Sequence, residues 1–299
     1  MVESKRGKPS DSGRHEALGD GERVPALRVR GLVVRYGART ILDGVDMSVP
    51  SGDVRVILGG SGSGKSTLLR GILGLTPIAG GTIEMLGADL PALDRAARVR
   101  HFRRVGVMFQ NGALFGSLTV AQNIALPLKE HARLPENLIR ELVRMKLELV
   151  QMTHAEHLYP DQLSGGMIKR AALARAMILD PEILFCDEPS AGLDPLTSAE
   201  LDALLLRLKA LFNMTVVVVT HELQSIETIA DSVIMLGRGH VIAEGPIDDI
   251  RRAGIPAVDD FFARRSQPEA QRRRSLAELL GVRDPDESHP ERAARGPLP

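Results

Sequence analysis

Short apolar segments and longer amphipathic segments follow one another along this chain, and together they predict a regular succession of strands and helices. Strand-like alternation or short apolar runs occur at residues 27–29, 32–34, 41–42 and 45–49. Continuous apolar runs, which are typical of buried strands, occur at residues 54–58, 105–109, 183–186 and 216–219. Turn residues between short strands predict two hairpins, at residues 80–87 and 232–243.

Helical periodicity fills the intervals between these strands. We expect one helix after Thr67 and a short one at residues 120–128, stopped near Pro127 because proline lacks the N–H that a helix needs. Three further helices have apolar faces, formed by Leu138, Leu142, Met145 and Leu149, by Ala171, Ala172, Ala174 and Ile178, and by Leu201, Leu204, Leu205, Leu208 and Leu211. Strands that alternate with helices predict an α/β fold with a largely parallel sheet covered on both faces.

This pattern fades towards both ends of the chain. Residues 1–25 are rich in glycine, serine and charge, so we expect a disordered arm there. Residues 26–250 are expected to form the folded domain, with a helical subdomain at about 111–180. Residues 251–299 are expected to be a largely disordered extension, in which Phe261 and Phe262 can dock as one short helix. The basic segment at residues 264–274 fits a solvated tail better than a contact with lipid headgroups or a partner.

The composition narrows the class of protein. With 299 residues, of which 43% are hydrophobic, the chain can form one large domain or two small ones. Lys and Arg number 38, as do Asp and Glu, so no overall field attracts nucleic acid or an anionic membrane. The single cysteine, Cys186, excludes an intramolecular disulfide and fits a reducing compartment. The charged N-terminal segment and the shortness of the apolar runs lead us to expect neither a signal peptide nor a membrane-spanning helix.

Residues 59–67 have the composition of a phosphate-binding loop. Gly59, Gly64, Lys65 and Ser66 fit the pattern G-x-x-x-x-G-K-S/T, and the loop stands between a predicted strand and a predicted helix. Glycines let consecutive backbone N–H groups turn towards an anion, Lys65 reaches the terminal phosphates, and the Ser66 hydroxyl can ligate Mg²⁺. The alternative is a flexible Gly/Ser turn. The candidate nucleotide-binding residues are Gly59, Gly60, Ser61, Gly62, Ser63, Gly64, Lys65, Ser66 and Thr67.

Two carboxylates follow the apolar run at residues 183–186 directly. Asp187 and Glu188 would therefore lie at the carboxyl end of a parallel strand, which is where such sheets bind ligands. We expect Asp187 to bind Mg²⁺, directly or through water, and Glu188 to accept a proton from water that attacks the terminal phosphate. A strand that ends in Asp-Glu is weak evidence alone, and it becomes strong behind a phosphate-binding loop.

The segment Leu163-Ser164-Gly165-Gly166-Met167 opens the next predicted helix. With it, the chain resembles the ATP-binding cassette (ABC) family, whose signature is usually written LSGGQ. Ser164 can be simply an N-cap, but an exposed Ser-Gly-Gly at a helix N-terminus is also an anion site. The resemblance implies that Ser164, Gly165 and Gly166 hold the terminal phosphate of ATP bound to the opposite subunit of a head-to-tail dimer. Met167 departs from the family's glutamine and leaves the hydroxyl and backbone donors in place.

The resemblance covers about residues 26–245 and implies roles for four further residues. Tyr36 matches the aromatic residue that stacks on adenine, and Gln110 the glutamine that senses Mg²⁺ and the attacking water. Asp194 matches the loop that crosses the dimer interface, and His221 the histidine that contacts the terminal phosphate. Taken alone, Tyr36 and His221 would fit structural roles better. The implied fold is a P-loop NTPase (RecA-like) core with an N-terminal antiparallel β-subdomain and an α-helical subdomain.

A narrower resemblance links the chain to the ATPase subunit of MCE-type (Mla-type) lipid transporters. It rests on Met167 and on the segments at residues 109–115, 125–131 and 169–176. It implies two copies bound to a membrane permease at the cytoplasmic face of the inner membrane, and a periplasmic MCE-domain protein beyond. The permease would dock near residues 111–128, where Leu114, Phe115 and Leu118 are candidate interface residues, although each fits core packing equally well.

The sequence also leaves alternatives to lipid transport. The same ATPase can drive an importer of another solute such as amino acids, because nothing in this subunit need touch the substrate. A soluble ABC ATPase that acts on DNA or ribosomes usually has long coiled-coil insertions or two cassettes in one chain, and neither occurs here. A binding-only module is disfavoured because Lys65, Asp187, Glu188 and His221 occur together. We therefore expect ATP hydrolysis coupled to transport, with ATP and Mg²⁺ bound and no nucleic-acid partner.

Overall fold

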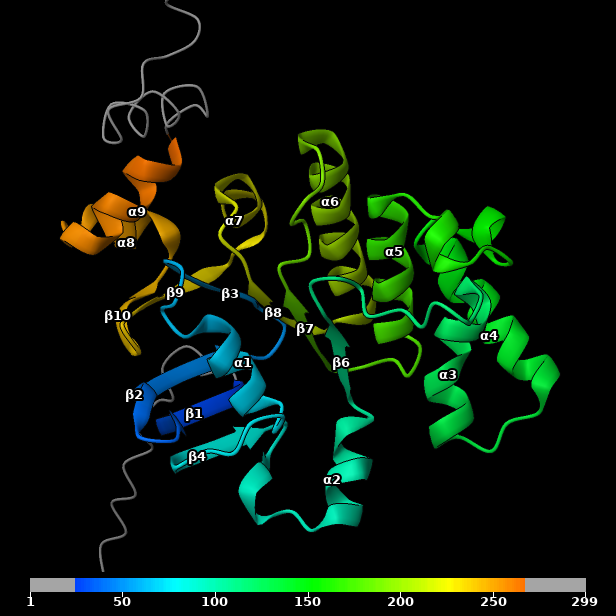
Figure 1. The fold of residues 1–299 in the computed structure, drawn as a ribbon, viewed down its shortest axis with the longest axis horizontal. Helices are drawn as coiled ribbons and strands as arrows, with labels where there is room; N and C mark the ends of the chain where they lie inside the picture. Colours follow the sequence, from blue (N-terminus) through cyan, green and yellow to red (C-terminus); the bar gives the residue numbers. More distant parts are fainter. Residues whose placement is uncertain (1–24, 267–299) are drawn as a thin grey trace, which may run out of the picture.

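The computed structural model describes residues 25–266, which fold around two β-sheets (Figure 1). Residues 1–24 of the predicted arm and residues 267–299 of the predicted extension lie outside the described residues, together with most of the basic segment at 264–274. The larger sheet has six strands and the smaller has four.

The six-stranded sheet forms the core of the fold. Its strands are, in spatial order, β10 (His240–Gly245), β9 (Ser232–Gly237), β3 (Val54–Gly59), β8 (Thr215–Val219), β7 (Ile183–Asp187) and β6 (Val105–Met108). All run parallel except β10, which pairs antiparallel with β9. The largely parallel sheet expected from the sequence is thus confirmed. Only the edge strand β6 differs from the prediction of a fully buried strand, since Val105 and Val107 are half-buried.

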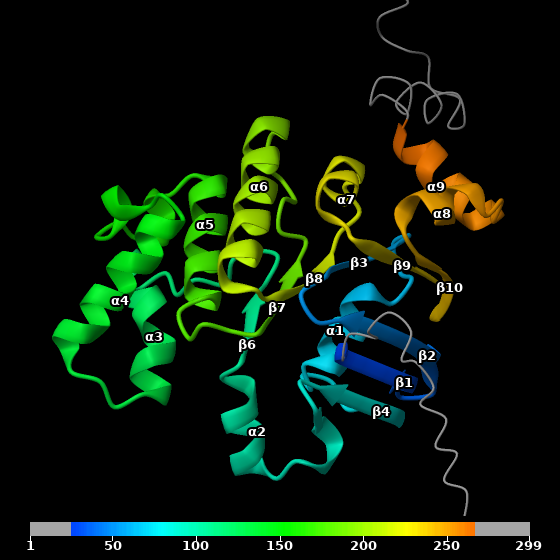
Figure 2. The ribbon, with the colours of Figure 1, turned by 180° about the vertical axis from the view of Figure 1, so that it is seen from behind.

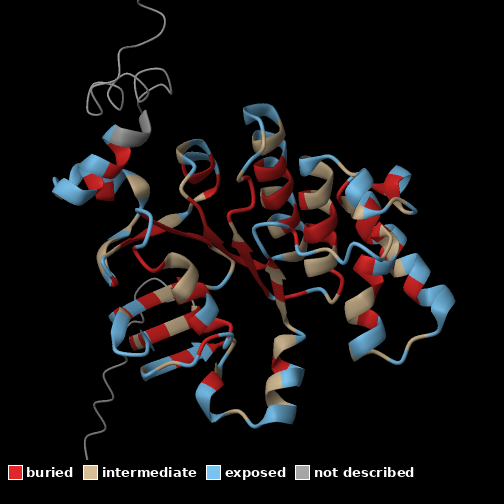
Figure 3. Cartoon of the chain, viewed as in Figure 1, coloured by how far each residue is buried: buried red, intermediate tan, exposed pale blue. Residues whose placement is uncertain are grey.

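Successive side chains of the central strands point to opposite faces of this sheet and build two cores. In β8, Val216 and Val218 belong to one core, and Val217 and Val219 to the other. Helices α5 (Gly165–Ala176), α6 (Pro195–Phe212) and α7 (Leu223–Ile229) lie on the first face, while α1 (Lys65–Ile72) and the smaller sheet lie on the second (Figures 1 and 2). Figure 3 shows the resulting band of buried strands through the middle of the molecule.

The four-stranded sheet is the predicted antiparallel β-subdomain. Its spatial order is β2 (Arg39–Pro50), β1 (Pro25–Tyr36), β4 (Gly80–Met85) and β5 (Ala88–Asp89). The two strands expected at residues 27–29 and 32–34 form one continuous strand, because a shift of register beside Gly31 (φ +57°) carries the chain on without a break. After β5 come a 3₁₀ turn (Leu90–Ala92) and helix α2 (Arg95–Phe102), which the sequence analysis did not predict.

Helices α3 (Val120–His131) and α4 (Glu136–Leu149) lie beside α5, away from the antiparallel sheet (Figures 1 and 2). Two 3₁₀ turns, Thr153–Ala155 and Pro160–Gln162, lead from α4 to α5. The predicted stop near Pro127 is wrong. The helix continues to His131 because Pro127 removes only its own N–H, while a capping box at Thr119 and Gln122 holds the first turn and buried Leu128 anchors the last.

Two predicted apolar faces need correction. In α4 the buried residues are Ile139, Val143, Lys146 and Leu147, whereas Leu138 and Met145 of the expected stripe are 41% and 58% exposed. The helix carries apolar residues around more than half of its circumference, and its packing against α3 and α5 selects one face. In α6, Leu201, Leu204, Leu205 and Leu208 are buried as expected, but Leu211 in the last turn is 59% exposed.

Helix α8 (Ile247–Arg252) crosses the boundary that we expected at residue 250, and α9 (Pro256–Ser266) follows it. The first part of the extension at residues 251–299, which we expected to be largely disordered, is therefore helical. Phe261 and Phe262 of α9 are buried, with their rings perpendicular and their centroids 5.4 Å apart. Burial of these two rings explains why the helix forms, and it agrees with the expected docking of one short helix.

Candidate active site

The loop between β3 and α1 can exist only with glycine at two of its positions. A Cβ atom at Gly59 (φ +149°) would lie 2.4 Å from the backbone oxygen of Leu236. A Cβ atom at Gly64 (φ +108°), the N-cap of α1, would lie 2.6 Å from a methyl carbon of Leu42. Between them, Gly60, Ser61 and Gly62 are exposed. The loop therefore stands open to an anion at the N-terminus of α1.

Lys65 is the first residue of α1, and its side chain folds back over this loop. Its Nζ donates to the carbonyl oxygens of Gly59 (2.8 Å) and Gly60 (3.1 Å). Ser66 and Thr67 follow in the first turn and are half-buried. Ser63 is buried, and its Oγ has no hydrogen-bond partner among the described residues. Residues 59–67 thus form one loop and the first turn of α1, with the lysine ammonium group held on the carbonyl oxygens of Gly59 and Gly60. Their role as a phosphate cradle stays a prediction.

The carboxyl ends of three neighbouring strands bring the other candidate residues to this loop. The loop itself follows β3, His221 follows β8 by two residues, and Asp187 and Glu188 end and follow β7. Because the three strands are adjacent and parallel, their ends share one edge of the sheet. Residues that are more than 150 positions apart in sequence, such as Lys65 and His221, therefore converge at this edge.

Glu188 is held in a fixed orientation. Its backbone has φ +49°, in the left-handed region, and its N–H donates to the carbonyl of Val219 at 2.7 Å. One carboxylate oxygen, Oε1, lies 2.6 Å from Nδ1 of His221, while Oε2 is buried without a hydrogen-bond partner in the described part of the chain. The imidazole thus orients the carboxylate and leaves its second oxygen able to accept a proton.

Asp187 lies next to Glu188, and its environment suits a bound cation. Burial raises the pKa of the Asp187 carboxyl, and the charge of Glu188 raises it further, whereas Arg70, Lys65 and Lys169 lower it. Its Oδ1 is buried and has no hydrogen-bond partner among residues 25–266. The described chain contains no group of three or more His, Cys, Asp or Glu side chains suited to a metal ion. A Mg²⁺ ion held by one carboxylate, a hydroxyl and phosphate oxygens fits this donor set.

Lys169 belongs to the site, although no role was predicted for it. It comes from α5 and is buried, and its Nζ donates to the backbone oxygens of Gln110 and Glu188, the second at 3.0 Å. Burial lowers its pKa, while the charges of Glu188 and Asp187 raise it. One ammonium group thus joins the ends of β6 and β7 to the helix that follows Ser164. One feature of the sequence could have indicated this role: Lys169 lies on the inward, alanine-rich face of a predicted helix, where a charged side chain needs a partner.

Ser164, Gly165 and Gly166 are brought together, but away from the Lys65 loop of the same chain. Ser164 is the N-cap of α5, and its Oγ accepts from the N–H of Met167 at 3.3 Å. Figures 1 and 2 show α5 and α1 well separated on opposite faces of the sheet. A Cβ atom at Gly166 would lie 2.7 Å from Cγ2 of Thr197, so glycine permits contact between the N-termini of α5 and α6.

Asp194 and Tyr36 come from two other elements, α6 and β1. Asp194 is the N-cap of α6 and accepts hydrogen bonds from Thr197, which hold its carboxyl pKa below the usual range. Tyr36 ends β1 and is 49% exposed, and its hydroxyl lies 3.3 Å from that of Thr76. Gln110, just beyond β6, is exposed, and its backbone oxygen is fixed by Lys169. Each of these three side chains is accessible to a ligand or a second chain.

Comparison with known proteins places this geometry in a family. The sequence model of the family described as ABC transporter matches residues 42–191, from β2 through the loop after Glu188. The chain belongs to the ABC transporter family. The expected resemblance to ABC ATP-binding subunits is confirmed, and the chain is an ATP-binding, ATP-hydrolysing cassette of that family.

Curated relatives of this ABC ATPase include two named transport proteins. It is 39% identical to the "Probable ribonucleotide transport ATP-binding protein mkl" of Mycobacterium leprae over 82% of its own length and 72% of that protein. The same protein from Mycobacterium tuberculosis is covered to 66%. The "Intermembrane phospholipid transport system ATP-binding protein MlaF" of Escherichia coli is 40% identical over 78% of this chain and 87% of MlaF.

Solved ABC ATPases share the fold. The structure of cbiO1 from Clostridium perfringens, part of an ABC transporter complex, aligns with a TM-score of 0.71 at 27% identity and covers 86% of this chain. A dimeric ATP-binding cassette in a post-hydrolysis state, bound to ADP and Pi, aligns with a TM-score of 0.68 at 29% identity over 74% of this chain. Among residues 25–266, every helix is too short or too polar to cross a lipid bilayer.

Proposed function

We propose that this ABC ATPase energises the transport of phospholipids or other lipids across a cell envelope, and that it works as a head-to-tail dimer with ATP and Mg²⁺ in shared sites. The observation that carries the catalytic part is the pair formed by Glu188 Oε1 and His221 Nδ1, 2.6 Å apart, at the sheet edge that also bears the Lys65 loop. A carboxylate so oriented, beside a phosphate cradle, supports hydrolysis rather than binding alone.

ATP would bind with its phosphates in the cradle of Gly59 to Thr67. Backbone N–H groups and the N-terminus of α1 favour the negative charge, and Lys65 would exchange its two carbonyl partners for phosphate oxygens. Tyr36 would stack on adenine. Ser66, Asp187 and Gln110 are the residues that we propose to hold Mg²⁺. When bound, the ion supplies positive charge that neutralises the phosphate oxygens.

Glu188 would act as the general base. Its Oε2 would accept a proton from water as the water oxygen attacks the terminal phosphorus, while His221 keeps the carboxylate aligned through Oε1. The side chain of His221 is 31% exposed, and in our proposal its ring would also contact the terminal phosphate. Lys169 would fix the backbone of Glu188 and Gln110 during this step.

A second copy would complete each site. Within one chain, Ser164, Gly165 and Gly166 stand apart from the Lys65 loop, and at the N-terminus of α5 their backbone N–H groups would be available to an anion. In a head-to-tail dimer these residues would close over the terminal phosphate bound by the partner, with Asp194 at the interface. The dimeric state of the aligned ADP-bound cassette supports this arrangement.

A membrane permease would dock on the loop at residues 111–119. Asn123 is fully buried and ties this loop down, because its side chain bonds to backbone groups of Phe115, Leu118 and Thr119. Phe115 is nevertheless 53% exposed, whereas Leu114 packs partly into the core. An exposed aromatic ring on a loop of fixed shape suits a protein contact. The ATPase would thereby lie at the cytoplasmic face of the inner membrane, with an MCE-domain protein on the far side.

Lipid is our preferred cargo because the phospholipid transport protein MlaF is matched over 87% of its length at 40% identity. Ribonucleotides are the second candidate, because the mkl proteins are matched at 39% identity, over 66–72% of their length. To decide, the membrane complex would be purified through a tag on this chain and reconstituted into vesicles. We expect ATP-dependent movement of labelled phospholipid. Movement of ribonucleotides but not phospholipid would overturn the lipid assignment.

The catalytic proposal has its own test in Glu188→Gln. The amide cannot accept the proton, so steady-state ATP hydrolysis should fall at least about 100-fold while ATP-dependent dimerisation persists. Turnover within twofold of the wild-type rate would remove Glu188 from the role of base. Glu222→Gln, at the neighbouring carboxylate 3.3 Å from His221 Nε2, serves as the matched control and should hydrolyse ATP normally.

A further inference from the structure

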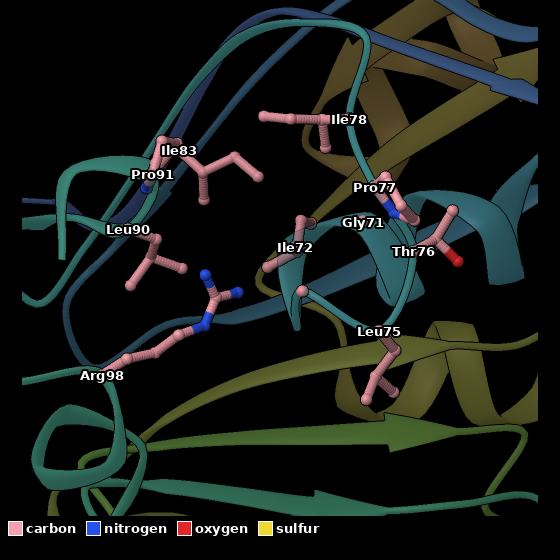
Figure 4. Close-up of a pocket in the computed structure, with 11 residues that line it drawn as sticks. Gly71, Ile72, Leu75, Thr76, Pro77, Ile78, Ile83, Leu90, Pro91 and Arg98 are labelled. Atoms are coloured by element: carbon pink, nitrogen blue, oxygen red, sulfur yellow. The ribbon is translucent and has the colours of Figure 1, made fainter. Parts of the chain in front are cut away.

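A pocket separate from the active site opens at the C-terminal end of α1 (Figure 4). It has a volume of about 420 Å³, which is within the range of small-molecule sites, about 300–1,000 Å³. Its walls come from α1, from the segment that leads to β4, from the 3₁₀ turn after β5 and from α2. Ile72, Ile83 and Leu90 form its almost fully buried base, while Pro77, Ile78 and Pro91 are its more accessible apolar residues.

Arg98 of α2 supplies the one charged group in this lining, and Figure 4 shows its guanidinium pointing into the space between Leu90 and Ile72. Among residues 25–266, no carboxylate lies within ion-pair distance of Arg98, and its recorded contact is with the ring of Phe102, 5.6 Å from the centroid. The neighbouring arginine Arg104, by contrast, is paired with Glu182. The half-buried charge of Arg98 thus lacks an anion.

The backbone is shaped to admit this guanidinium. A Cβ atom at Gly74 (φ +67°) would lie 1.6 Å from Nη2 of Arg98, so a side chain at this position would expel the group from its place. Gly74 also needs glycine for its left-handed backbone. An apolar pocket that contains a single unpaired guanidinium is complementary to a molecule with an apolar body and one anionic group.

We propose that this pocket binds a small anionic amphiphile of the medium-chain fatty acid class, with its carboxylate on Arg98 and its hydrocarbon chain against Pro77, Ile78 and Pro91. A planar carboxylate can accept two parallel N–H bonds from a guanidinium, which neither a neutral alcohol nor an apolar ligand can do. The alternatives are free phosphate and an apolar group that needs no charge, and the arms of the test separate them.

Two structural elements connect the pocket to the region of the nucleotide site. Helix α1 begins with Lys65 at the phosphate cradle and ends with Ile72 in the pocket wall. Thr76, which also lines the pocket, shares a hydrogen bond with Tyr36, the candidate adenine-stacking residue. Binding of a ligand in this pocket does not depend on which cargo is transported, so its test is independent of the lipid assignment.

The test is calorimetric titration of the full-length ATPase with sodium octanoate, 1-octanol and inorganic phosphate. We expect saturable one-site binding of octanoate, at least tenfold tighter than 1-octanol and phosphate. Equal binding of octanoate and octanol would show that the pocket needs no anion. Preference for phosphate would show a simple anion site. Absence of octanoate binding would show that the pocket does not take this ligand. Each of these three results would overturn the proposal.

Variants locate the binding at Arg98. Arg98→Gln should weaken octanoate binding at least tenfold, and Arg98→Lys, which keeps the charge but loses the planar pair of N–H donors, should weaken it less than Arg98→Gln does. Arg95→Gln, on the same helix but exposed and outside the pocket lining, is the matched control and should bind octanoate normally. All three substitutions lie on one surface helix, and unchanged thermal unfolding would confirm their folding. Wild-type affinity in Arg98→Gln would contradict the proposal.

Discussion

Lys169 offers the most direct test of how the active site is held together. Its Nζ donates to two backbone oxygens, those of Gln110 and Glu188, in a buried setting. Lys169→Met keeps the length of the side chain but removes both bonds and leaves two buried carbonyl groups without a donor. Each charge-assisted bond contributes about 1.5–3 kcal/mol, and methionine recovers part of this because it needs no ammonium desolvation. We expect a net loss of about 3 kcal/mol in the free energy of unfolding.

Urea unfolding measures this loss. With an unfolding slope of roughly 3 kcal/mol/M, the midpoint of Lys169→Met should fall by about 1 M. ATP hydrolysis should fall about tenfold or more as well, because the backbone that carries Glu188 is no longer fixed. Lys129→Met is the control, since its ammonium group pairs 3.0 Å from Glu136 on the surface and should contribute no more than about 1 kcal/mol. A midpoint for Lys169→Met as high as that of Lys129→Met would refute the reasoning.

Three further predictions concern buried groups. Burial raises the pKa of Asp202 above its unfolded value of about 3.9, so the folded state prefers the protonated form and stability falls as pH rises through this window. Asp202→Asn should therefore gain stability relative to wild type as the pH rises above about 3.9, and a pH-independent difference in urea midpoints would contradict this. Gly59→Ala should lose about 3 kcal/mol in unfolding free energy, because its Cβ meets the Leu236 backbone, while Gly60→Ala, which meets open space, should not. Cys186, whose pKa burial raises to about 12, should resist alkylation at pH 8 until the protein is denatured, and rapid native labelling would exclude its burial.

Much of the fold was predictable because local pattern and tertiary role agree in the central strands. The run from Val216 to Val219 is apolar on both faces, and only a sheet covered on both faces buries such a strand. The faces of α4 were not predictable. That helix carries two apolar stripes, and helices α3 and α5 bury the stripe that includes Ile139 and Val143. The helical period alone does not say which of the two stripes will be buried.

In the candidate site too, residues within a local motif were predictable, and residues whose role depends on distant contacts were not. Residues named by a local motif, such as Lys65 and Glu188, converge at one sheet edge because the motif itself fixes strand, turn and helix. Lys169 was missed because its role depends on Gln110 and Glu188, which lie 59 and 19 positions away in the sequence. Helix α2 was missed because its basic sequence has weak apolar periodicity. The pocket lined by Arg98 of this helix was therefore missed as well.

The central claim is that each catalytic site is shared between two copies of the chain, and a mixing experiment tests it most directly. Lys65→Ala destroys the phosphate cradle, Ser164→Arg blocks the closing surface, and each variant alone should be inactive. In a mixed dimer one site has both defects and the other has neither, so an equimolar mixture should regain about a quarter of the wild-type ATPase rate. A mixture no more active than the sum of its separate components would contradict the shared site.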